Sequence, residues 1–222
     1  MAIALHNTPM NKNVSAATAS APAENDPPLS KRELILHSAS ELFLGSGFEG
    51  TSMDQVAVNA GVSKQTVYSH FGSKEALFTA VIESKCQRHA ITGDLFDINR
   101  PVHDVLVELA EHFTDLILSP EAINLHRICI AGGEKYSQIA RLFWQAGSSW
   151  LQREFAGYLD KKQADGAVNI GNTLHAAQQF LYMLKGEAHL RLLLNLEEPV
   201  EKAALDDYIG NCVALFEKAY LS

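Results

Sequence analysis

The sequence predicts an all-α protein with a small N-terminal domain and a larger C-terminal one. From Ser30 onward, apolar residues recur three and four positions apart, which is the period of an amphipathic helix. Serine, threonine and proline stand where helices would begin, and glycine stands where several would end. No segment of useful length alternates apolar and polar residues as a half-buried strand does.

The first expected helix follows a segment that we expect to be a flexible arm. Residues 1–28 are poor in large apolar side chains and rich in Ala, Ser, Thr, Asn and Pro, so they cannot bury enough surface to offset the entropy of ordering. Ser30 is placed to cap a helix, and Glu33 is placed to return the hydrogen bond. Gly45 and Gly47 would stop this helix. Its apolar face consists of Ile35, Ala39, Leu42 and Phe43.

Two short helices joined by a tight turn come next. Thr51 or Ser52 would cap the first of them, and Gly61 can take the positive φ that such a turn requires. Ser63 would cap the second, and Ser73 would cap a fourth helix. The residues expected to face inward are Met53, Val56, Ala57, Ala60, Val67, Phe71, Leu77, Phe78, Val81 and Ile82. The first three helices make a three-helix N-terminal domain, residues 29–78.

The remaining residues, 79–222, are expected to form the larger C-terminal helical domain. A break at Thr92-Gly93 ends the fourth helix. Pro101, Pro120 and Pro199 lie at or near helix starts, where proline is tolerated. Apolar periodicity predicts helices over Val102–Leu118, Ala122–Ala131, Ser137–Leu159, Thr173–Leu196 and Val200–Leu221.

Composition limits the classes of protein to which the chain can belong. Its 222 residues are 47% hydrophobic and 20% charged, as in an ordinary globular protein. No run approaches the ~18 apolar residues of a membrane helix, so we expect no membrane partner. The three cysteines are scattered without a CxxC pair, which indicates a reduced, cytoplasmic setting. A net charge of -8 argues against a protein that coats polyanions without specificity.

The second helix of the pair carries the strongest functional signal. Between Asp54 and Glu75 there is no acidic residue, and the polar side chains of this helix are of types that bind nucleic acid. In a helix-turn-helix, the start of the second helix meets base edges in the major groove. We therefore expect Ser63, Lys64, Gln65 and Thr66 to contact bases, and Tyr68, His70 and Lys74 to hold phosphates. Thr51 and Ser52, at the start of the first helix of the pair, complete the predicted DNA-binding set. The alternative is that SKQTVYSH is only a solvated helix face.

Residues 31–82 resemble the DNA-binding domain of TetR-family transcriptional regulators. The matching residues are Ile35, Ala39, Leu42-Phe43, Gly47-Phe48, Thr51-Ser52, Val56-Ala57, Ala60-Gly61-Val62-Ser63, Val67-Tyr68, His70-Phe71, Lys74-Glu75 and Leu77. The resemblance implies a mostly helical homodimeric repressor whose C-terminal domain binds a small effector. It also implies base reading by positions 63–66 and phosphate contacts by positions 68, 70 and 74. The C-terminal run looks like that of AcrR-like members, which are often tied to efflux control.

A lipophilic effector would occupy an apolar cavity with a few polar groups. The candidates for its lining are His126, Arg127, Phe143, Trp144, Trp150, Phe155, Gln178, Gln179, Phe180, Tyr182 and Met183. The alternative is that these aromatic residues form an ordinary helical core. The resemblance places a dimer four-helix bundle on the last two helices. Candidates for that interface are Ala176, Ala177, Leu181, Leu184, Gly186, Ala188, Leu192 and Phe216.

The sequence therefore predicts a transcriptional repressor that a small lipophilic effector releases from a pseudo-palindromic operator in double-stranded DNA. Activation instead of repression is left open. A second alternative is a redox-responsive regulator acting through Cys86, on the helix that links the domains. An enzyme is disfavoured because no HExxH, GxSxG or phosphate-binding loop occurs, and no cofactor or metal is expected. His126 and Cys129 lack further ligands at zinc-site spacing.

Overall fold

A computed structural model describes residues 29–132, 137–196 and 201–221, and within these ranges the chain is helical. The prediction of an all-α fold is confirmed. The only β pairing in the described residues is an isolated bridge between Val168 and Leu221. The predicted arm, residues 1–28, lies outside the described residues.

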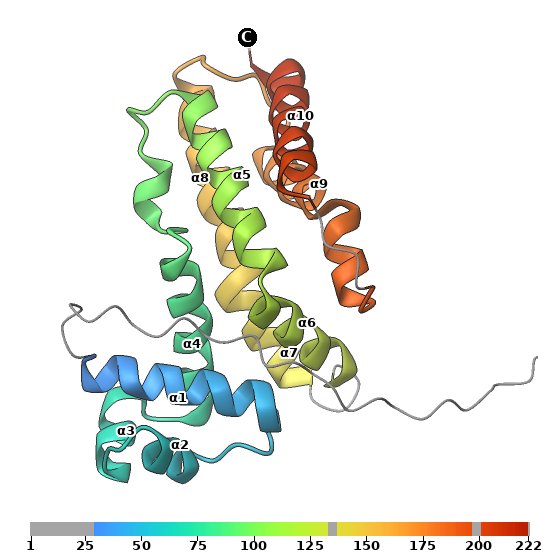
Figure 1. Ribbon diagram of the computed structural model, residues 1–222. Coiled ribbons are helices and arrows are strands. Elements are labelled where there is room, and N and C mark those ends of the chain that lie inside the picture. The colour runs from blue at the N-terminus through green and yellow to red at the C-terminus, as the bar shows by residue number, and fades with distance from the viewer. Residues whose placement is uncertain (1–28, 133–136, 197–200, 222) are drawn as a thin grey trace, which may run out of the picture.

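The N-terminal helices pack at one end of the molecule, and α4 leads from them into the larger bundle (Figure 1). Their bounds are α1 (Lys31–Ser46), α2 (Met53–Asn59), α3 (Lys64–Phe71) and α4 (Lys74–Arg88). All four begin at a serine, because the hydroxyls of Ser30, Ser52, Ser63 and Ser73 each accept a backbone N–H three residues on. The expected caps are confirmed, with Ser52 rather than Thr51 capping α2. The proposed domain limit after residue 78 falls within α4.

A cluster of three phenylalanine rings fixes the angle between α1, the loop after it and α4. The ring centroids of Phe43, Phe48 and Phe78 lie 5.3 to 5.7 Å apart, and two of the three contacts are edge-to-face. Such pairs stabilise a fold beyond their buried area. The helix-turn-helix is therefore held rigidly against the first turns of α4.

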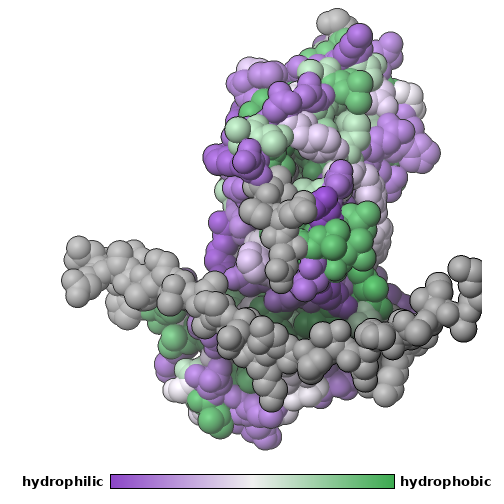
Figure 2. All heavy atoms as spheres, turned by 45° about the vertical axis from the view of Figure 1, so that its right-hand side comes forward, coloured by the Kyte–Doolittle hydropathy of each residue, from purple (hydrophilic) through white to green (hydrophobic). Residues whose placement is uncertain are grey.

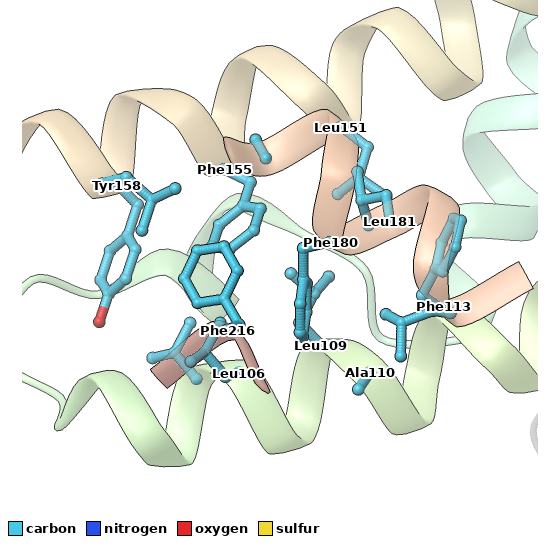
Figure 3. Packing of buried hydrophobic residues seen from close by; sticks show 14 of the residues in the cluster. Leu106, Leu109, Ala110, Phe113, Leu151, Phe155, Tyr158, Phe180, Leu181 and Phe216 are labelled. Carbon is cyan, nitrogen blue, oxygen red and sulfur yellow. The ribbon is translucent and has the colours of Figure 1, made fainter. Parts of the chain in front are cut away.

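The C-terminal bundle consists of α5 (Val102–Leu118), α8 (Trp150–Ala164), α9 (Thr173–Leu193) and α10 (Lys202–Tyr220). Its core holds aromatic rings from three helices, with Phe180 5.7 Å from Phe155 and 5.0 Å from Phe216 (Figure 3). Leu106 and Leu109 of α5 close the same core. Between this bundle and the N-terminal helices lie α6 (Pro120–Gly132) and α7 (Ser137–Phe143), and a short 3-10 turn, η1 (Gly93–Phe96), follows α4.

Two interruptions were not expected from the sequence. The segment predicted as one helix over Ser137–Leu159 contains a π-helical stretch, η2 (Trp144–Ser149), between α7 and α8. Helix α9 is broken at Gly186, whose φ of 54° and ψ of -163° are not helical. The two halves of α9 therefore run in different directions, as Figure 1 shows.

Candidate nucleic-acid interface and ligand cavity

A glycine turn and one buried anchor orient α3. Gly61 adopts a φ of 65°, which lets α3 follow α2 after a short turn. The Ser63 hydroxyl accepts the Thr66 N–H at 3.1 Å and so begins the helix. Val67 is the one residue of α3 that is fully buried, and it fixes the rotation of the helix about its axis. The polar side of α3 consequently faces solvent.

Three of the predicted DNA-binding side chains are exposed to solvent on this face. Gln65, Tyr68 and His70 are exposed. Gln65 makes no side-chain hydrogen bond within the described part of the chain, so both its amide groups remain available to a base edge. Tyr68 is 43% exposed, so its ring and hydroxyl are accessible to a partner on this face.

The fourth side chain, Lys64, is exposed but forms an ion pair within the domain. Its Nζ lies 2.8 Å from a carboxylate oxygen of Asp54 on α2, and both side chains are mostly exposed. The hydrogen bond and the charge of Asp54 raise the pKa of Lys64. A DNA phosphate or guanine must therefore compete with Asp54 for the ammonium group.

Thr51 and Lys74 both make contacts within the N-terminal domain. Thr51 is 2% exposed, and its hydroxyl donates to the Gly47 carbonyl at 2.8 Å. The Lys74 ammonium donates to the Phe48 carbonyl at 2.9 Å and lies 4.2 Å from the centre of the Phe48 ring. Burial removes the Thr51 side chain from the DNA-facing surface. Lys74 is half-buried and contacts the loop between α1 and α2, and its contact with phosphate stays a prediction. Ser52 is exposed, but its hydroxyl is engaged in the cap with Gln55.

An apolar cavity of about 90 Å³ lies where the two domains meet. Helix α1 contributes Ser40, Phe43 and Leu44 to its wall, and α4 contributes residues from Phe78 to Cys86. The π-helical stretch contributes Gly147 and Ser148, so the local widening of that helix opens onto the cavity. Helices α5, α6, α8 and α9 supply further residues of the wall: Phe113, Leu116, Ile117, Glu121, Ala122, Leu125, His126, Leu151 and Lys185.

The few polar side chains of this wall are partly desolvated. Burial lowers the pKa of Lys85 and of Lys185. Burial also lowers the pKa of His126, whose Nδ1 is 2.9 Å from the Ala122 carbonyl. Since a carbonyl only accepts, Nδ1 carries the proton of the neutral ring. These groups are candidates to orient a bound molecule.

Two of the residues proposed from the sequence for a ligand site line this cavity. They are His126 and Phe143, whose rings meet edge-to-face at 4.8 Å. The others lie elsewhere. Phe180 and Phe155 are in the bundle core, as Figure 3 shows. Trp150 lies at a separate hollow beside Ile91.

The remaining candidates are engaged in structural contacts or lie on the surface. Arg127 donates to the backbone carbonyls of Leu192 and Leu193, which ties the end of α9 to α6. Gln178 donates to Gln152 at 3.1 Å. Trp144, Gln179 and Tyr182 are exposed, and Met183 is half-buried against the core of the bundle. The residues of α1, α4 and α5 in the cavity wall are not among those predicted from the aromatic C-terminal helices. The sequence signal for this wall is Lys85, a lysine within an apolar helix face.

Most residues proposed for the dimer interface pack inside this chain and are not exposed to a second copy. Ala176, Leu181, Leu184 and Phe216 are buried in the core of the C-terminal bundle, and Ala177 with them. Ala188 and Leu192 are half-buried, and Gly186 forms the break in α9. Apolar surface gathers instead on the outer side of α9 and α10, the side that Figure 2 turns forward. The exposed apolar residues of α9, of the turn after it and of α10 are Leu174, Tyr182, Leu190, Leu194, Leu196, Tyr208 and Leu215, and of these Tyr182 and Leu215 line one shallow hollow.

Cys86 is buried in α4, and burial raises the pKa of its thiol to about 11. A thiol reacts with oxidants as its thiolate, so this environment is unlike that of a redox-sensing cysteine. Among the described residues there is no group of three or more His, Cys, Asp and Glu side chains that would hold a metal ion. Within the same ranges, no helix is long and apolar enough to cross a membrane.

The N-terminal domain has three helices that begin at serine caps, and a glycine turn joins the second helix to the exposed polar third helix. This arrangement is that of a helix-turn-helix transcriptional regulator. Residues 35–81 match the tetR family of bacterial regulatory proteins, and residues 104–222 match the C-terminal domain of AefR-like transcriptional repressors. The chain belongs to the TetR family, a family of DNA-binding regulators and not of enzymes. The C-terminal match is to the AefR-like group, whereas the sequence suggested AcrR-like members.

Individual relatives agree with this assignment. The chain is 32% identical over 145 residues to the transcriptional regulator RutR of Escherichia coli, covering 60% of this chain and 59% of RutR. A TetR-family regulator from Mesorhizobium loti has a similar structure, with a TM-score of 0.71, 27% identity, and coverage of 86% of this chain and 97% of the other. The flavonoid-responsive regulator FrrA is similar with a TM-score of 0.67, 29% identity and the same two coverages.

Proposed function

We propose that this protein is a dimeric repressor that binds an operator through α3 and is released by a small lipophilic effector. The observation that carries the proposal is the place of the cavity. Its wall includes Ser40, Phe43 and Leu44 of α1, which packs against α2, and Phe78 of α4, which packs against α3. Phe43 and Phe78 belong both to this wall and to the aromatic cluster of the N-terminal domain.

Filling the cavity would therefore act directly on the orientation of the reading helix. A ligand changes an equilibrium only through its different affinity for the two states. A hundredfold loss of operator occupancy needs a preference of about 2.7 kcal/mol, because each tenfold corresponds to about 1.4 kcal/mol. At about 25 cal/mol per Å² of buried apolar area, this free-energy preference corresponds to roughly 110 Å² of apolar surface that the ligand buries in one state of the protein and not in the other. A one-ring ligand has enough surface for that.

Two further observations support the proposal. The C-terminal domain, which would receive the signal, matches repressors, and the relative FrrA is described as responsive to flavonoids, which are aromatic small molecules. The outer side of α9 and α10 carries an apolar surface suited to a second copy of the chain. A two-fold dimer would place two reading helices in successive major grooves, roughly 34–36 Å apart.

The test is selection of bound sequences from random double-stranded DNA by the purified protein, followed by titration of candidate effectors against the selected site. We expect one enriched pseudo-palindrome, and release of the protein from it by lipophilic compounds that also raise its melting temperature. Enrichment of no sequence would refute the DNA-reading proposal. Enrichment with no compound releasing the protein would refute the effector part alone.

A further inference from the structure

We propose that the cavity selects a small lipophilic anion, a carboxylate or phenolate of about one ring or a short acyl chain, and that Lys185 binds its charge. This inference rests on the proposed effector role of the cavity and specifies the chemical class of the effector. It depends on the wall of the cavity, where cationic side chains outnumber anionic ones and one cation has no counter-charge among the described residues.

Lys185 is the uncompensated cation. It lines the cavity from α9, directly before the break at Gly186. It has no hydrogen bond and no ion pair to any described residue, and its nearest specific contact is the Tyr182 ring, 4.7 Å from Nζ. Burial lowers its pKa, and no carboxylate of the described chain acts in the opposite direction. A desolvated ammonium without a counter-ion is costly, and an incoming anion would relieve that cost.

The other lysine of the wall differs in this respect. Lys85 also lines the cavity, and burial lowers its pKa, but the charge of Glu121 acts to raise it. Glu121 lies in the wall at the first turn of α6 and is largely exposed to solvent. The two lysines and one glutamate leave a net positive wall, and the excess charge belongs to Lys185.

One neutral histidine, His126, lines the cavity together with Lys185, and a second, His189, packs behind it. The His126 and His189 rings meet edge-to-face at 5.1 Å. Burial lowers the pKa of both rings, and the charge of Lys185 acts in the same direction. His189 is 7% exposed, and its Nε2 is buried without a hydrogen-bond partner among the described residues. Neutral imidazoles can donate or accept a hydrogen bond, but they bring no charge. Lys185 is therefore the group at this end that distinguishes an anion from a neutral molecule.

The size of the cavity limits the ligand. An apolar cavity of about 150 Å³ accommodates benzene in a well-studied protein. The cavity here is about 90 Å³, so a one-ring or short-chain molecule fits with a modest movement of the wall.

The experiment compares molecules matched in size and different in charge. Benzoate, benzyl alcohol and benzylamine form one set, and hexanoate, hexan-1-ol and hexylamine form the second. Each is titrated into the full chain by calorimetry. We expect the carboxylate of each set to bind about tenfold or more tightly than its alcohol, as for a hydrogen bond to a charged group, and the amine to bind most weakly.

Variants of the protein then test whether Lys185 causes the preference for the carboxylate. Lys185→Met should reduce the carboxylate to the affinity of the alcohol, and Lys185→Arg, which keeps the charge, should retain the preference. Lys218→Met, on the exposed side of α10 and away from the cavity, is the matched control and should leave all affinities unchanged. A melting curve checks that each variant folds.

Three outcomes would overturn the inference: equal or tighter binding of the alcohol, tighter binding of the amine, or a carboxylate preference that survives Lys185→Met. These outcomes leave the effector cavity itself intact, because a ligand has bound. Absence of binding by every molecule of both sets would refute the proposed effector cavity together with the inference.

Discussion

Replacing Gly186 with alanine tests the break in α9, which sets the direction of the segment beside Lys185. The φ and ψ of Gly186 lie close to a region that is occupied almost only by glycine, and forcing another residue there costs about 1–3 kcal/mol. An added Cβ would also lie 3.0 Å from the Tyr208 ring, whose hydroxyl donates to the Met183 carbonyl at 2.7 Å. Since about 1 kcal/mol shifts the Tm of a chain of this size by about 2–4 °C, Gly186→Ala should lower it by roughly 2–12 °C.

The matched control is Gly157→Ala. Gly157 lies inside α8 with a negative φ, and an added Cβ meets nothing within 4 Å. Alanine there should stabilise the protein by about 0.4–1 kcal/mol, since it reduces the entropy of the unfolded chain. The assay is thermal unfolding followed by circular dichroism, at one protein concentration for all variants. If Gly186→Ala raises the Tm as Gly157→Ala does, α9 is a continuous helix and the reasoning is refuted.

The remaining predictions concern charge at three sites. Asp54→Asn should release Lys64 to a base edge, so binding to the selected operator tightens, as measured by fluorescence anisotropy at one salt concentration. An unchanged affinity would show that Asp54 does not compete with DNA for Lys64. Burial lowers the pKa of His189 to about 4, below its usual 6.5, so this neutral ring contributes stability that is present above pH 6.5 and lost as the pH falls toward 4. The Tm of the wild type should therefore fall relative to that of His189→Leu over this range, and parallel curves would contradict the cause given. Because the Cys86 pKa is about 11, iodoacetamide should label the folded protein at Cys86 far more slowly than the unfolded protein, and peroxide should affect operator binding equally in wild type and Cys86→Ser; a selective loss in the wild type would restore the redox alternative.

Local sequence signals predicted the helices, but not the places where distant segments determine the geometry. The serine caps and the Gly61 turn depend on side chains within three residues of one another, so they could be read directly from the sequence. The break at Gly186 could not, because glycine is tolerated within helices and Tyr208, far along the chain, is packed against it.

In the candidate sites, too, the features set by nearby residues were predicted and those set by distant segments were not. Gln65, Tyr68 and His70 are presented as predicted, because their exposure follows from the period of one short helix. Thr51 and Lys74 are occupied by the backbone of the loop between α1 and α2, which the local pattern does not reveal. The cavity wall is assembled from helices of both domains, so the residues that line it depend on tertiary packing.

The central claim is that the start of α3 reads bases while its later residues hold the backbone. The most direct measurement compares Gln65→Ala and Tyr68→Ala by titration against the selected operator and its single-base variants. We predict that Gln65→Ala removes discrimination at one base pair, worth about 1–3 kcal/mol, and that Tyr68→Ala weakens binding to all sequences alike. Wild-type affinity and wild-type base preference in both variants would contradict the assignment of α3 as the reading helix.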